Sequence, residues 1–184
     1  MTIKGNQITI LQLISLVLYY GFAYYLPKSN SIPGKICFSR RIRYSLCKRI
    51  FKSIGKNVNI ERKAKFNIGT EVEIGDNSGL GINCVVPSDI CIGRDVMMGP
   101  NCHIFSRNHN FARIDIPMIQ QGETVSGKRT IIEDDVWIGQ DVTFTIGRHV
   151  AKGSIVGACT LLCKDFPPYS IIGGNPSRLL KSRV

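Results

Sequence analysis

The sequence predicts an all-β fold, a solenoid of short parallel strands, and three observations support this prediction. Large apolar residues recur at every sixth position from residue 68 to 109 and again from 132 to 167, glycine often follows them, and the fifth position is usually small or β-branched. A period of six matches neither an α-helix, with about 3.6 residues per turn, nor a simple alternating strand. It matches a chain that turns a corner every six residues and points one aliphatic side chain inward on each of three faces.

The first position of each hexapeptide carries the predicted core. All thirteen such residues are large and apolar, namely Ile68, Ile74, Leu80, Val86, Ile92, Met98, Ile104, Ile132, Ile138, Phe144, Val150, Val156 and Leu162. Because each coil of a solenoid pairs only with its neighbours, we expect these residues to stack into one continuous core. Ile54 and Ile60 extend the pattern toward the N-terminus as an earlier, less regular coil.

An apolar segment precedes the repeat. Residues 8 to 26 read ITILQLISLVLYYGFAYYL, and Thr9, Gln12, Ser15 and Tyr19 recur at intervals that place them on one side of a helix. The length fits a membrane span, a helix in the membrane interface, or a helix packed on the protein's own core or on a partner subunit. The sequence leaves these three interpretations open.

The positive charge is concentrated directly after this segment. The chain carries a formal net charge of +11, and residues 27 to 65 hold twelve basic side chains and one acid, so the rest is neutral. A basic block behind an apolar run indicates contact with an anionic membrane surface through residues 8 to 52, with the body of the protein in the cytoplasm at the inner face of the cytoplasmic membrane. Nucleic acid is not expected as a partner, because the basic stretch has no aromatic stacking platform or recognised motif.

Cysteine and histidine spacing argues against a metal site or a disulfide framework. The seven cysteines are odd in number and contain no CxxC pair. His103, His109 and His149 lack the closely spaced pair of a zinc site, so we predict no metal. Residues 122 to 129, GETVSGKR, nearly match a phosphate-binding P-loop, but Arg129 occupies the Ser/Thr position, and we exclude that function.

Both halves of the repeat and the closing segment LCKDFPPYSIIGGNPSRLLK resemble the hexapeptide-repeat acyltransferases, which fold as left-handed parallel β-helices. The segment GINCVVPSDICIGRDVMMGPNCHIFSRNHNF, then a loop, then IEDDVWIGQDVTF is similar to the branch of maltose, galactoside and nodulation-factor O-acetyltransferases, and most similar to relatives that modify capsular polysaccharide and O-antigen. The resemblance covers roughly residues 54 to 182. It implies a left-handed solenoid, a homotrimer, and active sites between neighbouring subunits.

The pattern and the resemblance together divide the chain into segments. Residues 1–53 are expected to form an N-terminal apolar helix and a basic connecting segment, 54–109 and 132–167 the left-handed β-helix, and 168–184 a C-terminal tail. Residues 110–131 interrupt a regular repeat, so we expect them to project from a corner as an inserted acceptor or active-site loop.

Transfer of an acetyl group from a thioester to a sugar hydroxyl needs a base for the hydroxyl proton and a donor for the oxyanion. His109 stands at the root of the inserted loop, and family members have their general base at the matching place, so the resemblance implies that role for His109. We expect direct transfer without a covalent intermediate, with a backbone N–H near Gly139 or Gln140 as the oxyanion donor.

The resemblance also implies the binding residues. Acetyl-CoA is the expected co-substrate, and its expected contacts are Gly139, Gln140, Ala158, Cys163, Lys164 and Arg178. On the acceptor side, Asn83 matches one of two asparagines of sugar-acetylating relatives, while Gly81 replaces the other. Trp137 is expected to stack on a sugar or to pack between subunits. From spacing alone, Gly139 and Ala158 are equally consistent with small corner residues.

The sequence therefore predicts an acetyl-CoA-dependent O-acetyltransferase that acts on a hydroxyl of a bacterial surface saccharide, such as capsule, O-antigen or a lipid-linked precursor. Two alternatives stay open, an N-acetyltransferase on an amino sugar and a catalytically inactive membrane-associated scaffold. The sequence leaves the acceptor sugar and the modified hydroxyl open.

Overall fold

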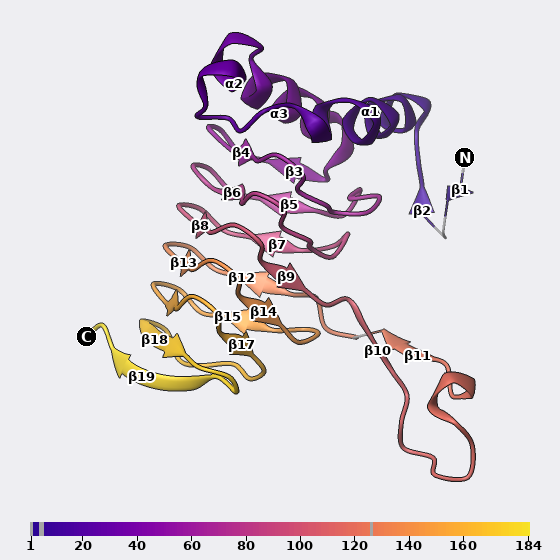
Figure 1. The fold of residues 1–184 in the computed structure, drawn as a ribbon, viewed down its shortest axis with the longest axis vertical. Helices are drawn as coiled ribbons and strands as arrows, with labels where there is room; N and C mark the ends of the chain where they lie inside the picture. The colour runs from indigo at the N-terminus through magenta and orange to yellow at the C-terminus, as the bar shows by residue number, and fades with distance from the viewer. Residues whose placement is uncertain (1, 4–5, 126) are drawn as a thin grey trace.

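The computed structural model describes residues 2–3, 6–125 and 127–184, and it is a parallel β-solenoid of about six turns. Three short helices cover the N-terminal end, and a long hairpin projects from the side of the prism (Figure 1). Before the helices, β1 (Thr2–Ile3) and β2 (Asn6–Gln7) form a small antiparallel pair.

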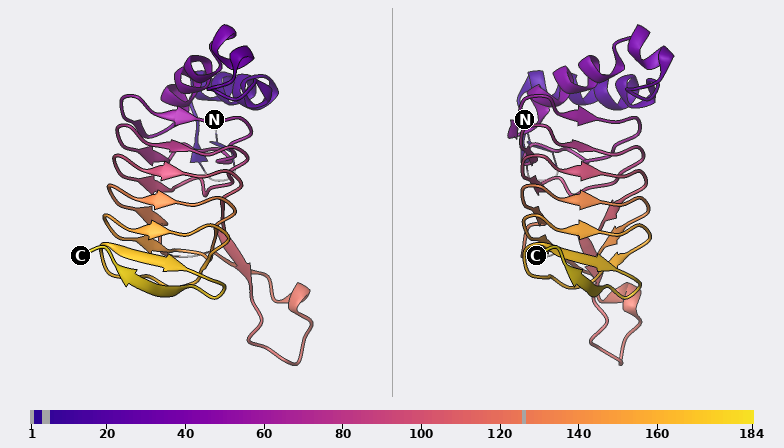
Figure 2. Two further views of the ribbon diagram at one scale, coloured as in Figure 1. Left: turned by 60° about the vertical axis from the view of Figure 1, so that its left-hand side comes forward. Right: turned by 90° about the vertical axis from the view of Figure 1, so that its left-hand side faces the viewer.

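The strands line three faces of the prism. The first face contains β3 (Ser53–Ile54), β5 (Glu73–Ile74), β7 (Cys91–Ile92), β12 (Ile131–Ile132) and β15 (His149–Val150). The second contains β4 (Asn59–Ile60) and β6 (Gly79–Leu80), which pair with each other, and then β8 (Met97–Met98), β13 (Trp137–Ile138), β16 (Ile155–Val156) and β18 (Ser170–Gly173). The third contains β9 (His103–Ile104), β14 (Thr143–Phe144) and β17 (Leu161–Leu162). Figure 2 shows the coils stacked in register from two further sides.

The inward position of each face carries the hydrophobic core, as the period predicts. Eleven of the thirteen first-position residues are buried at 3% exposure or less, and Ile68 and Met98 are half-buried. Ile68 is displaced because the first register step, Ser53 to Glu73, spans 20 residues, while Glu73 pairs with Cys91 after 18. Phe66 fills the inward position in that coil and is fully buried.

Asparagine and aspartate form the corners between faces. Asn83, Asn101 and Asp141 all have positive φ, near 57° or 58°, a conformation that short polar side chains tolerate better than other non-glycine residues. Their side chains also bond from coil to coil, Asn83 Nδ2 to Asn101 Oδ1 at 3.0 Å and Asn101 Nδ2 to Asp141 Oδ1 at 2.9 Å. The corner residues therefore both turn the chain and tie successive coils together.

The N-terminal region is more helical than the sequence predicts. The apolar segment forms α1 (Ile10–Gly21) and the 3-10 turn η1 (Ala23–Tyr25), and the basic segment, predicted as a connection, contains α2 (Ile32–Ile36) and α3 (Ser39–Ile50). Within the described part of the chain, no helix has the length and apolar character needed to cross a membrane. At the other end, β18 and β19 (Arg178–Ser182) form an antiparallel hairpin over the last coil.

The polar side of α1 faces the protein. Ser15 is 2% exposed and Tyr19 is fully buried, with its hydroxyl donating to the Ala64 carbonyl at 2.8 Å. Gln12 completes a capping box with Thr9 at the start of the helix. Burial raises the pKa of Tyr19 well above its usual value. The structure therefore packs the polar side of this helix on the protein's own core and leaves its apolar side exposed.

Arg43 on α3 is fully buried and joins the helices to the first coil. Its guanidinium donates to the carbonyls of Ile60 at 2.6 Å and Pro27 at 3.2 Å and to Ser29 Oγ at 2.9 Å, and it lies 3.7 Å from the Glu61 carboxylate. Burial lowers the pKa of Arg43. Burial acts to raise the pKa of Glu61, but hydrogen bonds, led by the Ser29 N–H, outweigh it and lower that pKa overall.

Adjacent residues of β12 provide a matched test of the core. Ile132 is fully buried, whereas Ile131 on the outer side of the same strand is 38% exposed. Ile132→Ala is expected to lower the free energy of unfolding by about 2–5 kcal/mol, because it leaves a cavity between stacked coils. Ile131→Ala should cost less than about 1 kcal/mol. Denaturant unfolding measures both, and equal losses would contradict the inward stacking.

Removal of the buried guanidinium tests the junction between helices and solenoid. Arg43→Met is expected to lower the free energy of unfolding by about 3–5 kcal/mol, because Glu61 and several buried carbonyls lose their partner. Exposed Arg41, on the same helix, is the control, and Arg41→Met should cost about 0.5 kcal/mol or less. Unfolding of both variants at the same denaturant concentration would show that Arg43 does not hold the junction.

Candidate functional site

A hairpin carries His109 away from the prism. It contains β10 (Arg107–His109), the 3-10 turn η2 (Met118–Gln120) and β11 (Glu123–Val125), and it leaves from the corner between the third and first faces (Figure 1). Across the insertion β7 pairs with β12, and the paired residues Cys91 and Ile131 are 40 residues apart instead of 18, so the insertion adds 22 residues. The projection begins at Arg107, three residues earlier than predicted, because β10 already pairs with β11. His109 therefore lies within the hairpin.

The imidazole of His109 is exposed and has no hydrogen-bond partner among the described residues. It lines a hollow of about 520 Å³ together with Phe111, Arg113 and Gln121, and Ile146 from the prism closes one side. Hydrogen bonds from the Asn110 side chain to the Gln121 carbonyl, at 2.9 Å, hold the two sides of the hairpin together. The ring is thus held at the wall of a hollow with both nitrogens open to a substrate.

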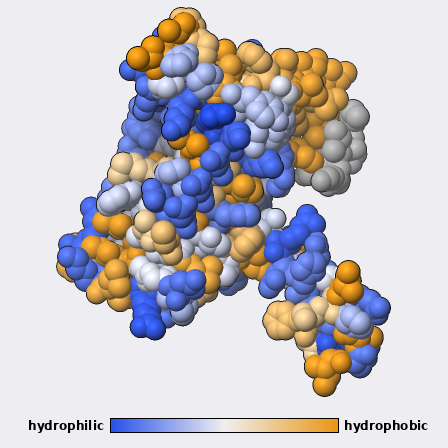
Figure 3. All heavy atoms as spheres, in the orientation of Figure 1, coloured by the Kyte–Doolittle hydropathy of each residue, from blue (hydrophilic) through white to orange (hydrophobic). Residues whose placement is uncertain are grey.

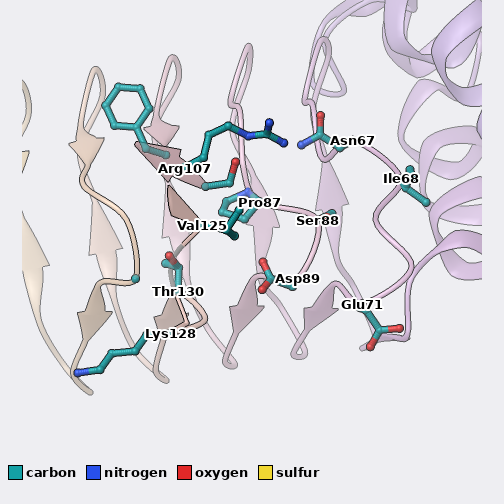
Figure 4. A pocket seen from close by; sticks show the side chains of 13 residues that line it. Asn67, Ile68, Glu71, Pro87, Ser88, Asp89, Arg107, Val125, Lys128 and Thr130 are labelled. Atoms are coloured by element: carbon teal, nitrogen blue, oxygen red, sulfur yellow. The ribbon is translucent and has the colours of Figure 1, made fainter. Parts of the chain in front are cut away.

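A second pocket runs along the corner at the base of the hairpin (Figure 4). Its volume is about 490 Å³, and successive coils contribute Asn67, Asp89 and Arg107 to its wall. Arg107 also pairs with Glu123 across the hairpin at 2.8 Å. The pocket therefore offers acids, amides and a guanidinium to a polar ligand close to the strand that carries His109.

Arg129 fixes the point where the hairpin returns to the prism. Its guanidinium bonds the Glu73 carboxylate at 2.7 Å and the carbonyls of Glu71 at 2.9 Å and Ile90 at 3.2 Å. Hydrogen bonds from Arg129 and then from Lys52 lower the pKa of Glu73. These contacts explain the arginine that breaks the near-match to a P-loop.

Three of the six predicted donor-side residues, Gly139, Gln140 and Ala158, lie at the corner between the second and third faces. A Cβ at Gly139 would lie 2.6 Å from the Ala158 nitrogen, so close coil stacking requires glycine there. The Gly139 N–H donates to the Val156 carbonyl at 2.8 Å. Gln140 is exposed, and within the described residues its N–H has no acceptor. Of the two predicted oxyanion donors, only Gln140 is therefore available.

The remaining donor-side residues lie near the C-terminal coil. Cys163 accepts from or donates to Ser177 Oγ at 3.4 Å, and hydrogen bonds from Ser177 lower the pKa of the thiol. Lys164 is exposed, with its ammonium 5.5 Å from the centre of the Phe166 ring, and Arg178 is exposed at the start of β19. Two cationic side chains therefore lie near the C-terminal end of the prism.

The two predicted acceptor residues lie away from His109 within one chain. Asn83 belongs to the corner column described above, and Trp137 on β13 is 51% exposed beside Met97, which is 64% exposed. The third face lies between this side of the prism and the corner that carries the hairpin. One chain therefore does not bring His109 together with Trp137 or Gln140.

The described residues contain no cluster of three or more His, Cys, Asp or Glu side chains that fits a metal ion. His149 lies 2.8 Å from Glu133, and His103 packs against Phe105 with ring centres 4.9 Å apart. Each of these histidines has its own local partner.

Sequence reasoning missed the pocket at the base of the hairpin. Asp89 and Arg107 occupy the same corner on consecutive coils, 18 residues apart, but neither stands in a motif. The repeat could have indicated this pocket, because residues 18 positions apart lie at the same corner on consecutive coils.

Comparison with known proteins identifies the family. No family model matches the chain. Galactoside O-acetyltransferase of Escherichia coli (strain K12) is 30% identical over 141 residues, which are 76% of this chain and 68% of that enzyme. The match includes the repeat on both sides of the hairpin.

Two solved structures share the fold. A hexapeptide-repeat acetyltransferase of Vibrio cholerae, complexed with acetyl coenzyme A, superposes with a TM-score of 0.72 at 27% identity over 94% of this chain and 86% of that chain. A galactoside acetyltransferase in complex with coenzyme A gives a TM-score of 0.73 at 26% identity over 94% and 80%. The predicted left-handed β-helix is thereby confirmed. The chain belongs to the hexapeptide-repeat acetyltransferases of the galactoside O-acetyltransferase type, acyltransferases that use acetyl-CoA as the donor.

Proposed function

We propose that this protein transfers the acetyl group of acetyl-CoA to a hydroxyl of a bacterial surface saccharide, with His109 as the general base. The observation that carries the proposal is the open imidazole of His109 at the wall of the hairpin hollow. The relatives named above are O-acetyltransferases or bind coenzyme A, and this supports the same chemistry here.

The proposed step is a direct acyl transfer. His109 accepts the proton of the acceptor hydroxyl as its oxygen forms a bond to the thioester carbonyl carbon. The C–S bond then breaks, and the released thiolate takes that proton from His109 to give coenzyme A as the free thiol. The free N–H of Gln140 supports the oxyanion of the tetrahedral intermediate. Exposed Lys164 and Arg178 suit the phosphates of coenzyme A.

We infer that the working form is a homotrimer with each site shared between two copies. The hairpin leaves large apolar side chains uncovered, including Phe111 at 68%, Ile114 at 100% and Ile119 at 87% exposure. Such a surface on a projecting element favours cover by another subunit. In a cyclic arrangement the hairpin of one copy meets the Trp137 and Gln140 side of its neighbour.

The pocket lined by Asp89 and Arg107 is the proposed acceptor pocket, because it is polar, adjoins the strand of His109, and has a volume typical of small-molecule sites. Carboxylate and guanidinium groups are suited to sugar hydroxyls. We place the acceptor among capsular, O-antigen or lipid-linked saccharides, presented at the inner face of the cytoplasmic membrane.

Replacement of the base is the direct test of the mechanism. His109→Ala is expected to lower the rate of thioester consumption by at least about a hundredfold, because no other group accepts the hydroxyl proton. His149→Ala, on the first face, should retain the rate of the parent protein. Release of free thiol from acetyl-CoA in the presence of saccharide acceptors measures both. Undiminished turnover by His109→Ala would reject the assignment.

The product distinguishes this proposal from its alternatives. An acetyl ester is lost from the acceptor in mild base, whereas an acetamide on an amino sugar is retained. An inactive scaffold predicts no binding of coenzyme A by calorimetry and no thiol release by the parent protein.

Mixed trimers test whether the site is shared. His109→Ala and Trp137→Ala each should be nearly inactive alone, because each trimer then lacks one half of every site. Co-assembly of the two variants should restore up to about a quarter of the parent activity, since some neighbours then combine an intact His109 with an intact Trp137. Simple addition of the two residual rates would indicate that each copy holds a complete site.

A further inference from the structure

The outer side of α1 is a continuous apolar surface. Its polar residues face the protein, and the residues that face away include Ile10 at 76%, Ile14 at 50%, Val17 at 64% and Leu18 at 49% exposure. Positions 10, 14, 17, 18 and 21 follow the helical period, so they form one stripe, and Phe22 at 55% extends it. A helix on the surface of a globular protein normally has the opposite arrangement. The stripe is therefore built to contact something apolar.

Another helix at the same end of the molecule, α2, carries further exposed apolar side chains. Ile32, Ile36 and Phe38 are 77%, 72% and 57% exposed at α2 and its C-terminal end. Figure 3 shows one group of hydrophobic side chains over α2 and another over α1 at the helical end of the molecule. We call the stripe of α1 and these three residues the apolar cap. The α1 stripe within this cap is a contiguous apolar surface, and such surfaces on soluble proteins mark interaction sites.

The charges around the apolar cap identify the occupant. No aspartate or glutamate occurs before Glu61, and the first 60 residues contain exposed basic side chains at Lys28, Lys35, Lys48 and Arg49. A second copy would bring two positively charged surfaces together, which repel each other. An anionic bilayer offers both a hydrocarbon interior for the apolar side chains and negative headgroups for the lysines and arginines.

We propose that the apolar cap docks on the surface of an anionic membrane, with α1 lying in the plane of the interface. At about 1.5 Å per residue its 12 residues extend about 18 Å, a length suited to lying along the headgroup boundary. Hydrogen bonds from the Tyr19 and Tyr20 hydroxyls to the carbonyls of Ala64 and Asn67 keep the helix fixed on the protein while its apolar side enters the lipid. This docking is independent of the acetyl transfer, because no residue of the apolar cap belongs to the candidate site.

Vesicle flotation with the full chain tests the docking. The parent protein is expected to float with phosphatidylcholine vesicles that contain phosphatidylglycerol and much less with phosphatidylcholine alone. Val17→Glu should lower binding at least about tenfold, because a charge replaces a side chain that enters the hydrocarbon. Val184→Glu is the matched control, since Val184 is 91% exposed at the opposite end of the chain, and its binding should be unchanged. Lys48→Gln should weaken binding about fivefold, the share of one basic residue near an anionic surface.

Three results would overturn the proposal. The first is that Val17→Glu floats as well as the parent protein. The second is that the parent protein binds neutral and anionic vesicles equally. The third is that Val17→Glu changes the oligomeric mass in analytical ultracentrifugation without changing flotation. The last result would mean that the apolar cap covers another copy. Thiol release with a soluble acceptor should be the same for Val17→Glu and the parent protein, so failure of docking and failure of catalysis are distinguished.

Discussion

The coil-to-coil register is the constraint on which the rest of the structure depends. Each inward side chain stacks on the equivalent residue of the coils above and below, and parallel pairs such as Glu73 with Cys91 and Ile131 with His149 repeat every 18 residues. A single residue added to a face would turn its inward side chain outward. Extra residues are therefore accommodated only at corners, and the 22 added residues leave the prism as a hairpin with β7 and β12 still paired across the gap.

The same constraint places the two halves of the proposed site at different corners. The proposed base, His109, lies outside the prism on β10, which pairs with β11 of the hairpin. Gly139 has to be small and to donate its N–H to the next coil, so the backbone that remains open is that of Gln140. The third face separates these two corners within one chain. The proposed site is completed by a second copy, and the uncovered apolar residues of the hairpin are consistent with that proposal.

The sequence predicted the solenoid well because its signal is local and repeated. Ile132 and Ile138 face inward for the same reason that Ile74 and Ile92 do, and the break in the repeat located the projecting segment and His109. Features that depend on contacts distant in sequence were not predictable. Arg43 belongs to a basic block that indicates a solvated surface, yet its partners lie as far along the chain as Ile60 and Glu61.

The orientation of α1 is a further feature that the sequence did not predict. The helical period could be recognised in the sequence, but the buried side could not, because the burial of Tyr19 depends on a partner distant in sequence, the Ala64 carbonyl. With the apolar cap on a bilayer, the prism stands away from the lipid, and neighbouring strands of a sheet lie about 4.8 Å apart. The hairpin begins after β9 in the third coil, so His109 lies at least about 10 Å beyond the first coil. In the proposed docked arrangement, this distance favours a sugar on an extended lipid-linked chain over a lipid headgroup at the membrane surface as the acceptor.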